Sequence, residues 1–265
     1  MPDNPENEIM RYTVPPVERA IRLLRYIGDG NTCRPLSSAA KDLNINRTTL
    51  IRIIHTLRDA RMIAEIAEGA GYRLGPGLIS LGAQALHGRD IVQLCQPVLA
   101  ALCRETGMSA HLGILDGIDV VYLSRETPNT HLVSNVHAGS RLPAHASSMG
   151  RAILAAMSRY EIRALFDDQP FAATTDKTPL SIEAVLAQAA ADRAANVVWS
   201  EGNFEPGIGS CAAVILDHTG APVGGINVSG PRSAFAGETG TGGNAIRDAV
   251  ARAGRAASQA MGHSG

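Results

Sequence analysis

Apolar residues recur at helical spacing along residues 36–63 and predict two short helices joined by a tight turn. The first helix would bury Ala39, Ala40 and Leu43 on one face. The second would bury four residues that share its inner face, namely Leu50, Ile53, Ile54 and Leu57. Two amphipathic helices this close together predict a compact helix pair rather than a strand-rich segment.

Polar residues at the ends of this pair fit helix caps and a turn. Ser37 and Ser38 are candidate N-caps for the first helix, because their hydroxyls can accept from free first-turn amides. Asn44 tolerates a left-handed turn conformation, and Ile45 would pack into the corner between the helices. Asn46 would then cap the second helix.

The segments on either side complete a small domain. A helical stripe from Val17 to Ile27 precedes the pair, and two short strands, 62–66 and 72–74, follow it around a turn at 68–71. Three helices followed by a hairpin predict a winged helix-turn-helix, with Arg73 on the wing near a phosphate.

The pattern beyond residue 75 predicts an α+β fold with an antiparallel sheet flanked by helices. An apolar helical segment at 76–88 comes first, and Asp90 would cap the next helix. The predicted strands are 109–115, 118–125, 132–137, 197–200, 211–217 and 223–229. The other predicted helices are 148–157, one opened by a capping box at Ser158, 181–195 and 244–261, with loops at 139–147 and 237–243. We expect three parts: residues 1–75, a linker helix at 76–89, and residues 90–265.

The outer face of the second helix suggests nucleic-acid binding. Arg47, Thr48, Thr49 and Arg52 lie in its first two turns and avoid the apolar stripe. A recognition helix directs such residues at base edges and phosphates in the major groove of double-stranded DNA. The alternative is a solvated basic face of an ordinary amphipathic helix.

Charge favours the DNA interpretation for this segment only. The whole chain has 24 basic and 25 acidic residues, whereas residues 11–75 contain 11 basic and 6 acidic ones and carry +5. A basic module on an acidic remainder is typical of a protein that binds phosphates through one part.

Composition excludes several other classes. No apolar run approaches the roughly 20 residues that span a bilayer, and the acidic start does not resemble a signal peptide, so we expect a cytoplasmic protein without membrane contact. The four cysteines, Cys33, Cys95, Cys103 and Cys211, show no metal-site spacing and predict reduced, mostly buried thiols.

Motifs for catalysis and metal binding are absent from the sequence. There is no GxSxG, HExxH or Walker A motif. Cys211 with a nearby histidine could act as a nucleophile, but nothing in the sequence pairs them. His111, His131, His137 and His145 could converge on a metal, yet none has a ligand-like spacing. We therefore expect no enzyme, no metal and no cofactor.

At this level of detail the chain resembles the IclR family of bacterial transcriptional regulators along nearly its full length. The resemblance rests on several motifs in order: VERAIRLLRYI, LSSAAKDLNINRTTLIRIIHTLRDARMI, YRLGPGLISLG, SRLPAHASSMGRAIL and EGNFEPGIGSCAAVILDHTGAPVGGINVSGP. The stretch RLPAHASSMGR is most similar to the branch that answers protocatechuate, β-ketoadipate or 4-hydroxybenzoate. The chain departs from the family after Pro231, where GETGTGGN is unusually Gly-rich.

The resemblance implies a GAF-like effector domain after the linker helix, and a dimer or tetramer on a near-palindromic operator. It also implies an effector pocket. We expect the pocket at the helix N-terminus near Ser148, because the free amides there attract anions. The bland alternative there is ordinary capping by Ser147 or Ser148. The candidate effector-binding residues are Leu142, Ser147, Ser148, Met149, Ser200, Glu201, Ile208, Ser210, Cys211, Asn227 and Ser229.

These observations predict a regulator that binds DNA and senses a small carboxylate from aromatic catabolism. Two rival hypotheses remain open: a small-acid sensor or enzyme domain with a vestigial DNA-binding module, and an architectural DNA-binding protein without a ligand.

Overall fold

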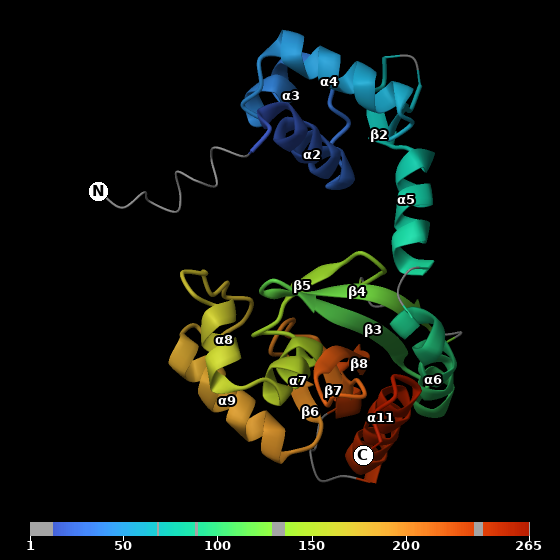
Figure 1. Ribbon diagram of the computed structural model, residues 1–265, viewed down its shortest axis with the longest axis vertical. Helices are drawn as coiled ribbons and strands as arrows, with labels where there is room; N and C mark the ends of the chain where they lie inside the picture. The colour runs from blue at the N-terminus through green and yellow to red at the C-terminus, as the bar shows by residue number, and fades with distance from the viewer. Residues whose placement is uncertain (1–12, 68, 88–89, 129–135, 236–240, 265) are drawn as a thin grey trace. The chain divides into compact units, whose positions relative to one another are not determined.

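The computed structural model describes residues 13–67, 69–87, 90–128, 136–235 and 241–264. The chain divides into two compact units, residues 1–88 and 89–265 (Figure 1). The elements of the first unit are α2 (Pro15–Gly28), α3 (Leu36–Asp42), α4 (Arg47–Asp59), β1 (Ile63–Glu65), β2 (Tyr72–Leu74) and α5 (Pro76–His87).

The first unit is a winged helix-turn-helix with its own core. Leu23 of α2, Leu50 of α4 and Ile63 of β1 are almost completely buried and pack in one cluster. Strands β1 and β2 pair antiparallel, with Ile63 opposite Leu74. The predicted fold of this part is confirmed, because helical periodicity and the hairpin are local signals.

The turn between α3 and α4 follows the sequence closely, with one error. Asn46 Oδ1 accepts from the Thr49 amide at 3.1 Å, and Asn44 has a φ of 50°. The prediction that Ser37 or Ser38 caps α3 is wrong. Pro35 is the cap residue, and its carbonyl accepts from the amides of Ser38 and Ala39, so the serines lie inside the helix.

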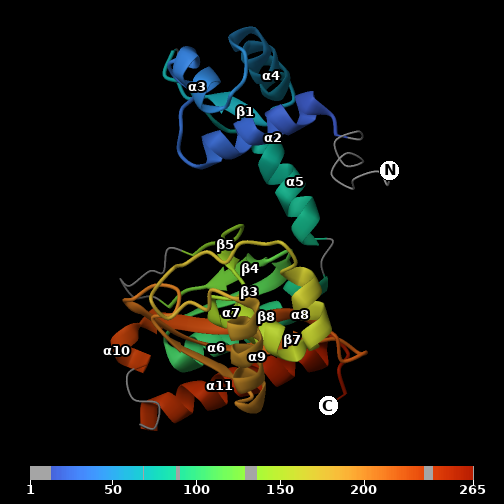
Figure 2. The same ribbon diagram turned by 90° about the vertical axis from the view of Figure 1, so that its left-hand side faces the viewer.

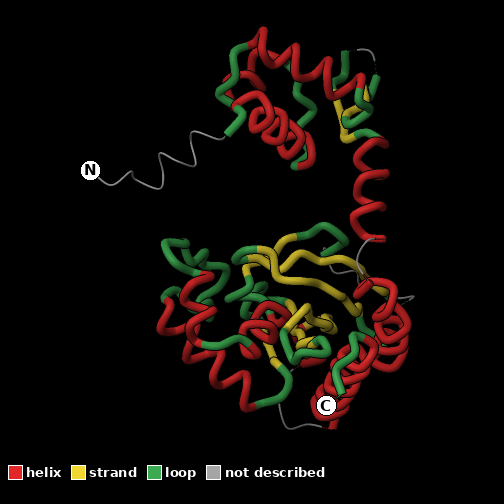
Figure 3. The backbone as a smooth tube through the Cα atoms, viewed as in Figure 1, coloured by secondary structure: helices red, strands yellow, loops and turns green. Residues whose placement is uncertain are grey.

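The second unit is built on one antiparallel sheet of order β5-β4-β3-β8-β7-β6. Its strands are yellow in Figure 3. Its strands are β3 (Ser109–Asp116), β4 (Asp119–Glu126), β5 (Arg141–Pro143), β6 (Val198–Glu201), β7 (Ile208–Leu216) and β8 (Pro222–Pro231). Its helices are α6 (Asp90–Thr106), α7 (Ser148–Ala156), α8 (Arg159–Leu165), α9 (Ile182–Ala194), α10 (Arg232–Phe235) and α11 (Thr241–Ala260), and Figure 2 shows them from the side. The predicted α+β class is confirmed.

Helices cover both faces of this sheet, and two adjacent glycines of β8 show which helix covers which face. A Cβ on Gly225 would lie 2.7 Å from Met149 Cγ of α7. A Cβ on Gly224 would lie 2.8 Å from Ile91 Cδ1 of α6. Successive strand residues point to opposite faces, so α7 and α6 lie on opposite sides of the sheet. Helix α11 lies on the side of α6, since Gly254 packs on Ala213, which pairs with Ile226.

Three predicted segments differ from the structure. The predicted loop at 139–147 contains strand β5, because Leu142 can pair with Val120 on the free edge of β4. Most of the strand predicted at 132–137 lies outside the described residues, and residues 136 and 137 are not in a strand. The Gly-rich loop predicted at 237–243 is helical from Thr241 onward, and its earlier part also lies outside the described residues. Helix α10 was not predicted, because a single turn has no periodicity to detect.

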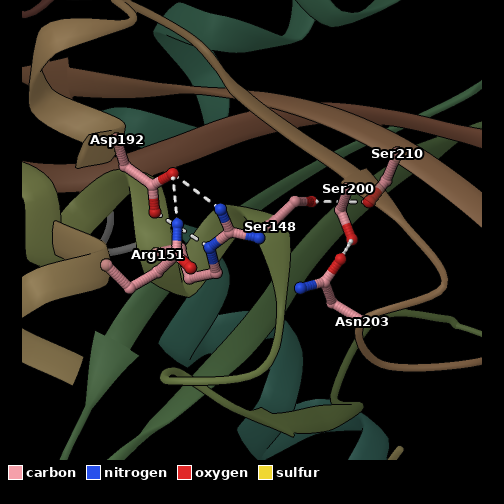
Figure 4. Close-up of polar contacts among 7 residues, drawn as sticks. Ser148, Arg151, Asp192, Ser200, Asn203 and Ser210 are labelled. Carbon is pink, nitrogen blue, oxygen red and sulfur yellow. Dashed lines mark hydrogen bonds and ion pairs between the residues drawn. The ribbon is translucent and has the colours of Figure 1, made fainter. Parts of the chain in front are cut away.

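A buried ion pair ties α7 to α9 (Figure 4). Arg151 Nε donates to Asp192 Oδ2 at 2.8 Å, and Arg151 Nη2 donates to Asp192 Oδ1 at 2.6 Å. Both side chains are only 7% exposed. Gln188 Nε2 adds a third donor to the same carboxylate at 3.0 Å. Such a pair fixes the geometry of the two helices, because neither charge tolerates the loss of its partner.

We therefore expect Asp192→Ala to lower the free energy of unfolding by about 3–5 kcal/mol, since Arg151 would stay buried without a counter-ion. The matched control is Glu183→Ala, also on α9, which breaks an exposed 3.5 Å pair with Arg163. That variant should cost less than about 1 kcal/mol. Urea denaturation of the full chain measures both, and equal costs would contradict this account.

Candidate nucleic-acid interface and small-molecule pocket

Helix α4 presents a polar outer face of the kind that a recognition helix needs. Arg47, Thr48 and Arg52 are exposed, and Thr49 is half-buried. The opposite face is buried in the core of the first unit. The Asn46 cap fixes where the helix starts, and therefore which residues occupy its first turn.

The basic side chains of this unit are available for phosphate contacts. Arg73 is exposed on β2. Among the residues that the structure describes, no ion pair is formed by Arg47, Arg52 or Arg73. Their charges are therefore not neutralised by neighbouring carboxylates of the described chain, which is the condition for counterion release on DNA.

In the second unit, a cavity of about 100 Å³ lies between the sheet and the start of α7. It is smaller than the roughly 300–1,000 Å³ of pockets for drug-sized ligands, so only a compact molecule fits. Eight of the eleven candidate effector-binding residues line it: Leu142, Ser147, Ser148, Ser200, Ile208, Ser210, Asn227 and Ser229.

Three candidates do not line the cavity, and strand alternation explains two of them. Ser200 and Glu201 are consecutive in β6, and Ser210 and Cys211 in β7, so only one of each pair can face α7. Cys211 is fully buried on the face of α6 and α11. Met149 is fully buried too, because its side chain enters the core between the sheet and α7 at Gly113 and Gly225.

Five lining residues were missed in the sequence: His111, Tyr122, Val136, Phe204 and Glu205. His111 could have been found from register, since it pairs with Asn227 across β3 and β8. That pairing joins residues 116 positions apart, and no local pattern predicts it. Phe204 and Glu205 belong to the turn between β6 and β7, whose conformation has no periodic signal.

Four polar side chains in the cavity wall form one connected network. Ser210 Oγ donates to Ser148 Oγ at 2.9 Å, as drawn in Figure 4, and Asn227 Nδ2 donates to the same oxygen at 3.4 Å. Asn227 Oδ1 lies 3.0 Å from His111 Nδ1. Ser200 Oγ donates separately to Asn203 Oδ1 at 3.1 Å (Figure 4). The network links α7, β3, β7 and β8 and fixes the side chains that a ligand would meet.

The start of α7 supplies the positive end of this site. Ser147 Oγ accepts from the Gly150 amide at 3.2 Å, so ordinary capping is present. The amides of Ser148 and Met149 precede the first intrahelical bond, from Arg151 to Ser147, and have no acceptor within the helix. No lysine or arginine is among the described residues that line the cavity, and its one carboxylate, Glu205, is exposed. An anion would therefore be held by amides, hydroxyls and the helix dipole.

Burial controls the protonation states in the wall. It lowers the pKa of His111 to about 4, against a smaller opposing effect of the hydrogen bond with Asn227 Oδ1. It raises the pKa of Tyr122 far above its ordinary value. Both side chains are therefore neutral at physiological pH. His111 Nε2 and Ser229 Oγ are buried, and neither has a hydrogen-bond partner in the described parts of the chain.

Residues considered for catalysis or metal binding are not arranged for either. Burial raises the pKa of Cys211 to about 12, so its thiol stays protonated and is a poor nucleophile. In the described parts of the chain, no three His, Cys, Asp or Glu side chains come together as metal ligands. His131 lies outside those parts, and His145 Nε2 lies 3.1 Å from the Ala172 carbonyl oxygen.

Comparison with known proteins identifies the class. The family model described as "Bacterial transcriptional regulator IclR C-terminal" matches residues 83–259. The chain belongs to the IclR family of bacterial transcriptional regulators, as the resemblance of its motifs predicted. The family's N-terminal helix-turn-helix and C-terminal effector domain are the two units described above.

Individual relatives agree with this assignment. The chain is 28% identical over 213 residues to the HTH-type transcriptional regulator XynR of Escherichia coli, covering 80% of this chain and 84% of that protein. A crystal structure of a putative transcriptional regulator from Rhodococcus sp. RHA1 superimposes with a TM-score of 0.79 at 26% identity, covering 94% and 99% of the two chains. An IclR homolog from Microbacterium hydrocarbonoxydans, complexed with 4-hydroxybenzoate, shares the fold with a TM-score of 0.74 at 20% identity, covering 92% and 99%. The curated relatives are named as transcriptional regulators and not as enzymes.

Among the described helices, none is both long and apolar enough to cross a membrane.

The cysteines provide a direct check on the electrostatics of the second unit. All four are free and buried, and burial also raises the pKa of Cys95 to about 11. Because the thiolate is the reactive species, a raised pKa keeps the thiol unreactive below it. We expect no rapid reaction of the native protein with an aromatic disulfide reagent at pH 8, and reaction of four thiols in urea. One fast-reacting native thiol at Cys211 would revive a nucleophilic role.

Proposed function

We propose that this regulator changes its affinity for a near-palindromic double-stranded operator when a small carboxylate occupies the cavity under α7. The observation that carries the proposal is the start of α7, where two amides without helical acceptors adjoin a compact cavity with a hydroxyl-rich wall. Family membership supports the DNA and effector parts of the statement, while the chemical class of the effector comes from the cavity.

The first unit would read the operator with α4. Arg47, Thr48, Thr49 and Arg52 would contact bases and phosphates in the major groove, and Arg73 on the wing would contact a phosphate. Their exposure on one side of a helix whose other side forms the core supports this assignment.

A near-palindromic operator calls for a homodimer or a tetramer. Two recognition helices must lie roughly 34 Å apart, or a multiple of that distance, to reach successive half-sites on one side of the duplex. Exposed apolar residues on α5, Ile79 at 75% and Leu81 at 51%, are candidates for burial in such an assembly.

The effector would place its carboxylate against the amides of Ser148 and Met149. Ser210, Asn227 or Ser229 would donate further hydrogen bonds, because a buried carboxylate without donors loses several kcal/mol of hydration. Met149 would act through its amide and not through its side chain, which belongs to the core.

The remaining wall favours a flat apolar body. Leu142 and Ile208 contribute aliphatic surface, and Tyr122 and Phe204 contribute rings. Among the products of aromatic catabolism, protocatechuate and 4-hydroxybenzoate have such a body, whereas β-ketoadipate is an aliphatic diacid and fits this wall less well. The Microbacterium relative is described with 4-hydroxybenzoate bound.

The two rival hypotheses are less well supported. A small-acid enzyme would need a reactive group in the cavity, and its histidine is neutral, buried and linked to Asn227. An architectural DNA-binding protein would have no use for a cavity lined by a polar network. In the regulator, a tenfold effect on DNA affinity needs about 1.4 kcal/mol of difference in ligand binding between two conformations.

The DNA contacts predict the behaviour of an arginine pair. Arg47→Ala with Arg52→Ala should weaken binding at least roughly tenfold, since one bidentate arginine–guanine contact contributes about 1–3 kcal/mol. The probe is a duplex that the wild-type protein selects from a random-sequence library, measured by mobility shift across a salt series. Affinity should also fall steeply as salt rises.

The control for this experiment removes the same charge elsewhere. Arg22 on α2 and Arg58 in the last turn of α4 are also exposed, and Arg22→Ala with Arg58→Ala should keep most of the specific affinity. The assignment of α4 as recognition helix would be wrong if the two double variants bound the duplex equally. The oligomer proposal would be wrong if sedimentation of the wild-type protein with its duplex showed monomers and no larger species.

The anion site predicts a difference between two substitutions of one residue. Ser148 is the first residue of α7, where a helix tolerates proline. Ser148→Ala removes the hydroxyl that contacts Ser210 and Asn227, whereas Ser148→Pro removes the amide as well. If the carboxylate binds that amide, the proline variant should bind acids at least roughly tenfold more weakly than the alanine variant.

Calorimetry against protocatechuate, 4-hydroxybenzoate, β-ketoadipate, pyruvate and glyoxylate would measure this difference, with the matching primary amides as neutral controls. Equal affinity of acids and amides, or equal affinity of the two variants for acids, would refute the anion site.

A further inference from the structure

His111 is a buried polar residue in the cavity wall that the proposed carboxylate site does not use. It lies on β3 and lines the cavity, with only 1% of the residue exposed. Its Nδ1 is engaged by Asn227, but its Nε2 is shielded from solvent and has no hydrogen-bond partner among the residues that the structure describes. A buried ring nitrogen of this kind is rare in native proteins, so a ligand group that reached it would gain a hydrogen bond without breaking one to the described chain.

The network fixes which ring nitrogen carries the proton. Asn227 Oδ1, which has no hydrogen, lies 3.0 Å from His111 Nδ1, while Asn227 Nδ2 donates to Ser148 Oγ. With the Asn227 amide in this orientation, His111 Nδ1 is the donor. Since burial lowers the pKa of His111 to about 4, the ring is neutral and carries one proton only. His111 Nε2 is consequently a bare acceptor.

A second unpaired group lies on the same face of the sheet. Ser229 is two residues along β8 from Asn227, which pairs with His111. The Oγ of Ser229 is also buried, and no described residue is its hydrogen-bond partner. Residues two apart on a strand share a face, and diagonal neighbours on adjacent strands are within reach of one bridging group. Tyr122 closes the other side of His111, with its ring 5.5 Å away in an edge-on arrangement.

A hydroxyl group is complementary to this pair, because it donates one hydrogen bond and accepts others. We propose that the effector carries a hydroxyl whose proton His111 Nε2 accepts and whose oxygen accepts from Ser229 Oγ. The pocket would thus take small hydroxy acids in preference to the same acids without the hydroxyl. The inference rests on the proposed carboxylate site at α7, which would hold the other end of the molecule. Both atoms are shielded from solvent, so the hydroxyl must displace neighbouring side chains to reach them. Its entry breaks no hydrogen bond that His111 Nε2 or Ser229 Oγ makes with a described residue.

Matched acids test the inference. Calorimetry with 4-hydroxybenzoate against benzoate, and with lactate against propionate, compares each hydroxy acid with its analogue. If either pair of acids binds the wild-type protein, the hydroxy acid of that pair should bind at least tenfold more tightly than its analogue. His111→Phe keeps a ring against Tyr122 but removes the acceptor, and should bring the two affinities together by weakening the hydroxy acid alone. Ser229→Ala, a smaller change to the fold, should reduce the ratio in part.

Nitrogen NMR of the histidine rings tests the tautomer without any ligand. The ligand-free wild-type protein should show His111 with a protonated Nδ1 and an unprotonated Nε2. A protonated Nε2 would overturn the inference, as would equal binding of the matched acids or an unchanged ratio in His111→Phe. If acids bind with no preference for the hydroxyl, the carboxylate site stands and only this inference fails. If no acid binds at the α7 amides, both fail.

Discussion

The close packing of α7 on the sheet is the constraint on which the second unit depends. Two strands carry glycine where the helix approaches: a Cβ at Gly113 would lie 2.8 Å from Met149 Sδ, and a Cβ at Gly225 would lie 2.7 Å from Met149 Cγ. This approach lets Met149 fill the core and brings Ser148 within hydrogen-bond reach of Ser210. The cavity is lined by the first residues of this helix together with residues of the sheet.

How far the sequence predicts the structure depends on the distance over which each signal acts. The winged helix follows from local signals, such as the Asn46 cap and the apolar stripe of α4. The N-cap of α3 was predicted wrongly because two adjacent hydroxyls do not show which residue precedes the helix. Pro35 is the N-cap, and the helix begins at Leu36. In the sheet, alternation alone would have rejected Glu201 and Cys211 as neighbours of Ser200 and Ser210 in one pocket. His111 was beyond such reasoning, because only the pairing of β3 with β8 brings it to Asn227.

The wall of the cavity combines an anion-attracting end with neutral groups elsewhere. A lysine or arginine in this small volume would attract many anions, whereas amides and hydroxyls discriminate by position. The neutral state of His111 extends this logic, because a protonated ring would donate from both nitrogens and attract a second negative charge. Burial, which lowers the pKa of His111 to about 4, thereby decides what the site can recognise.

Helix α7 carries both the proposed ligand contacts and one partner of the buried Arg151–Asp192 ion pair. Ser148 and Arg151 lie three residues apart on α7, so they are neighbours within one turn. The first would contact the effector, and the second is held by Asp192 of α9 in a pair that is 7% exposed. A shift of α7 toward a bound anion must therefore move α9 with it or stretch a buried ion pair, which is costly. Such a coupling favours concerted movement of the two helices over a local adjustment. A regulator needs concerted movement, because ligand binding must change the conformation of the protein beyond the pocket.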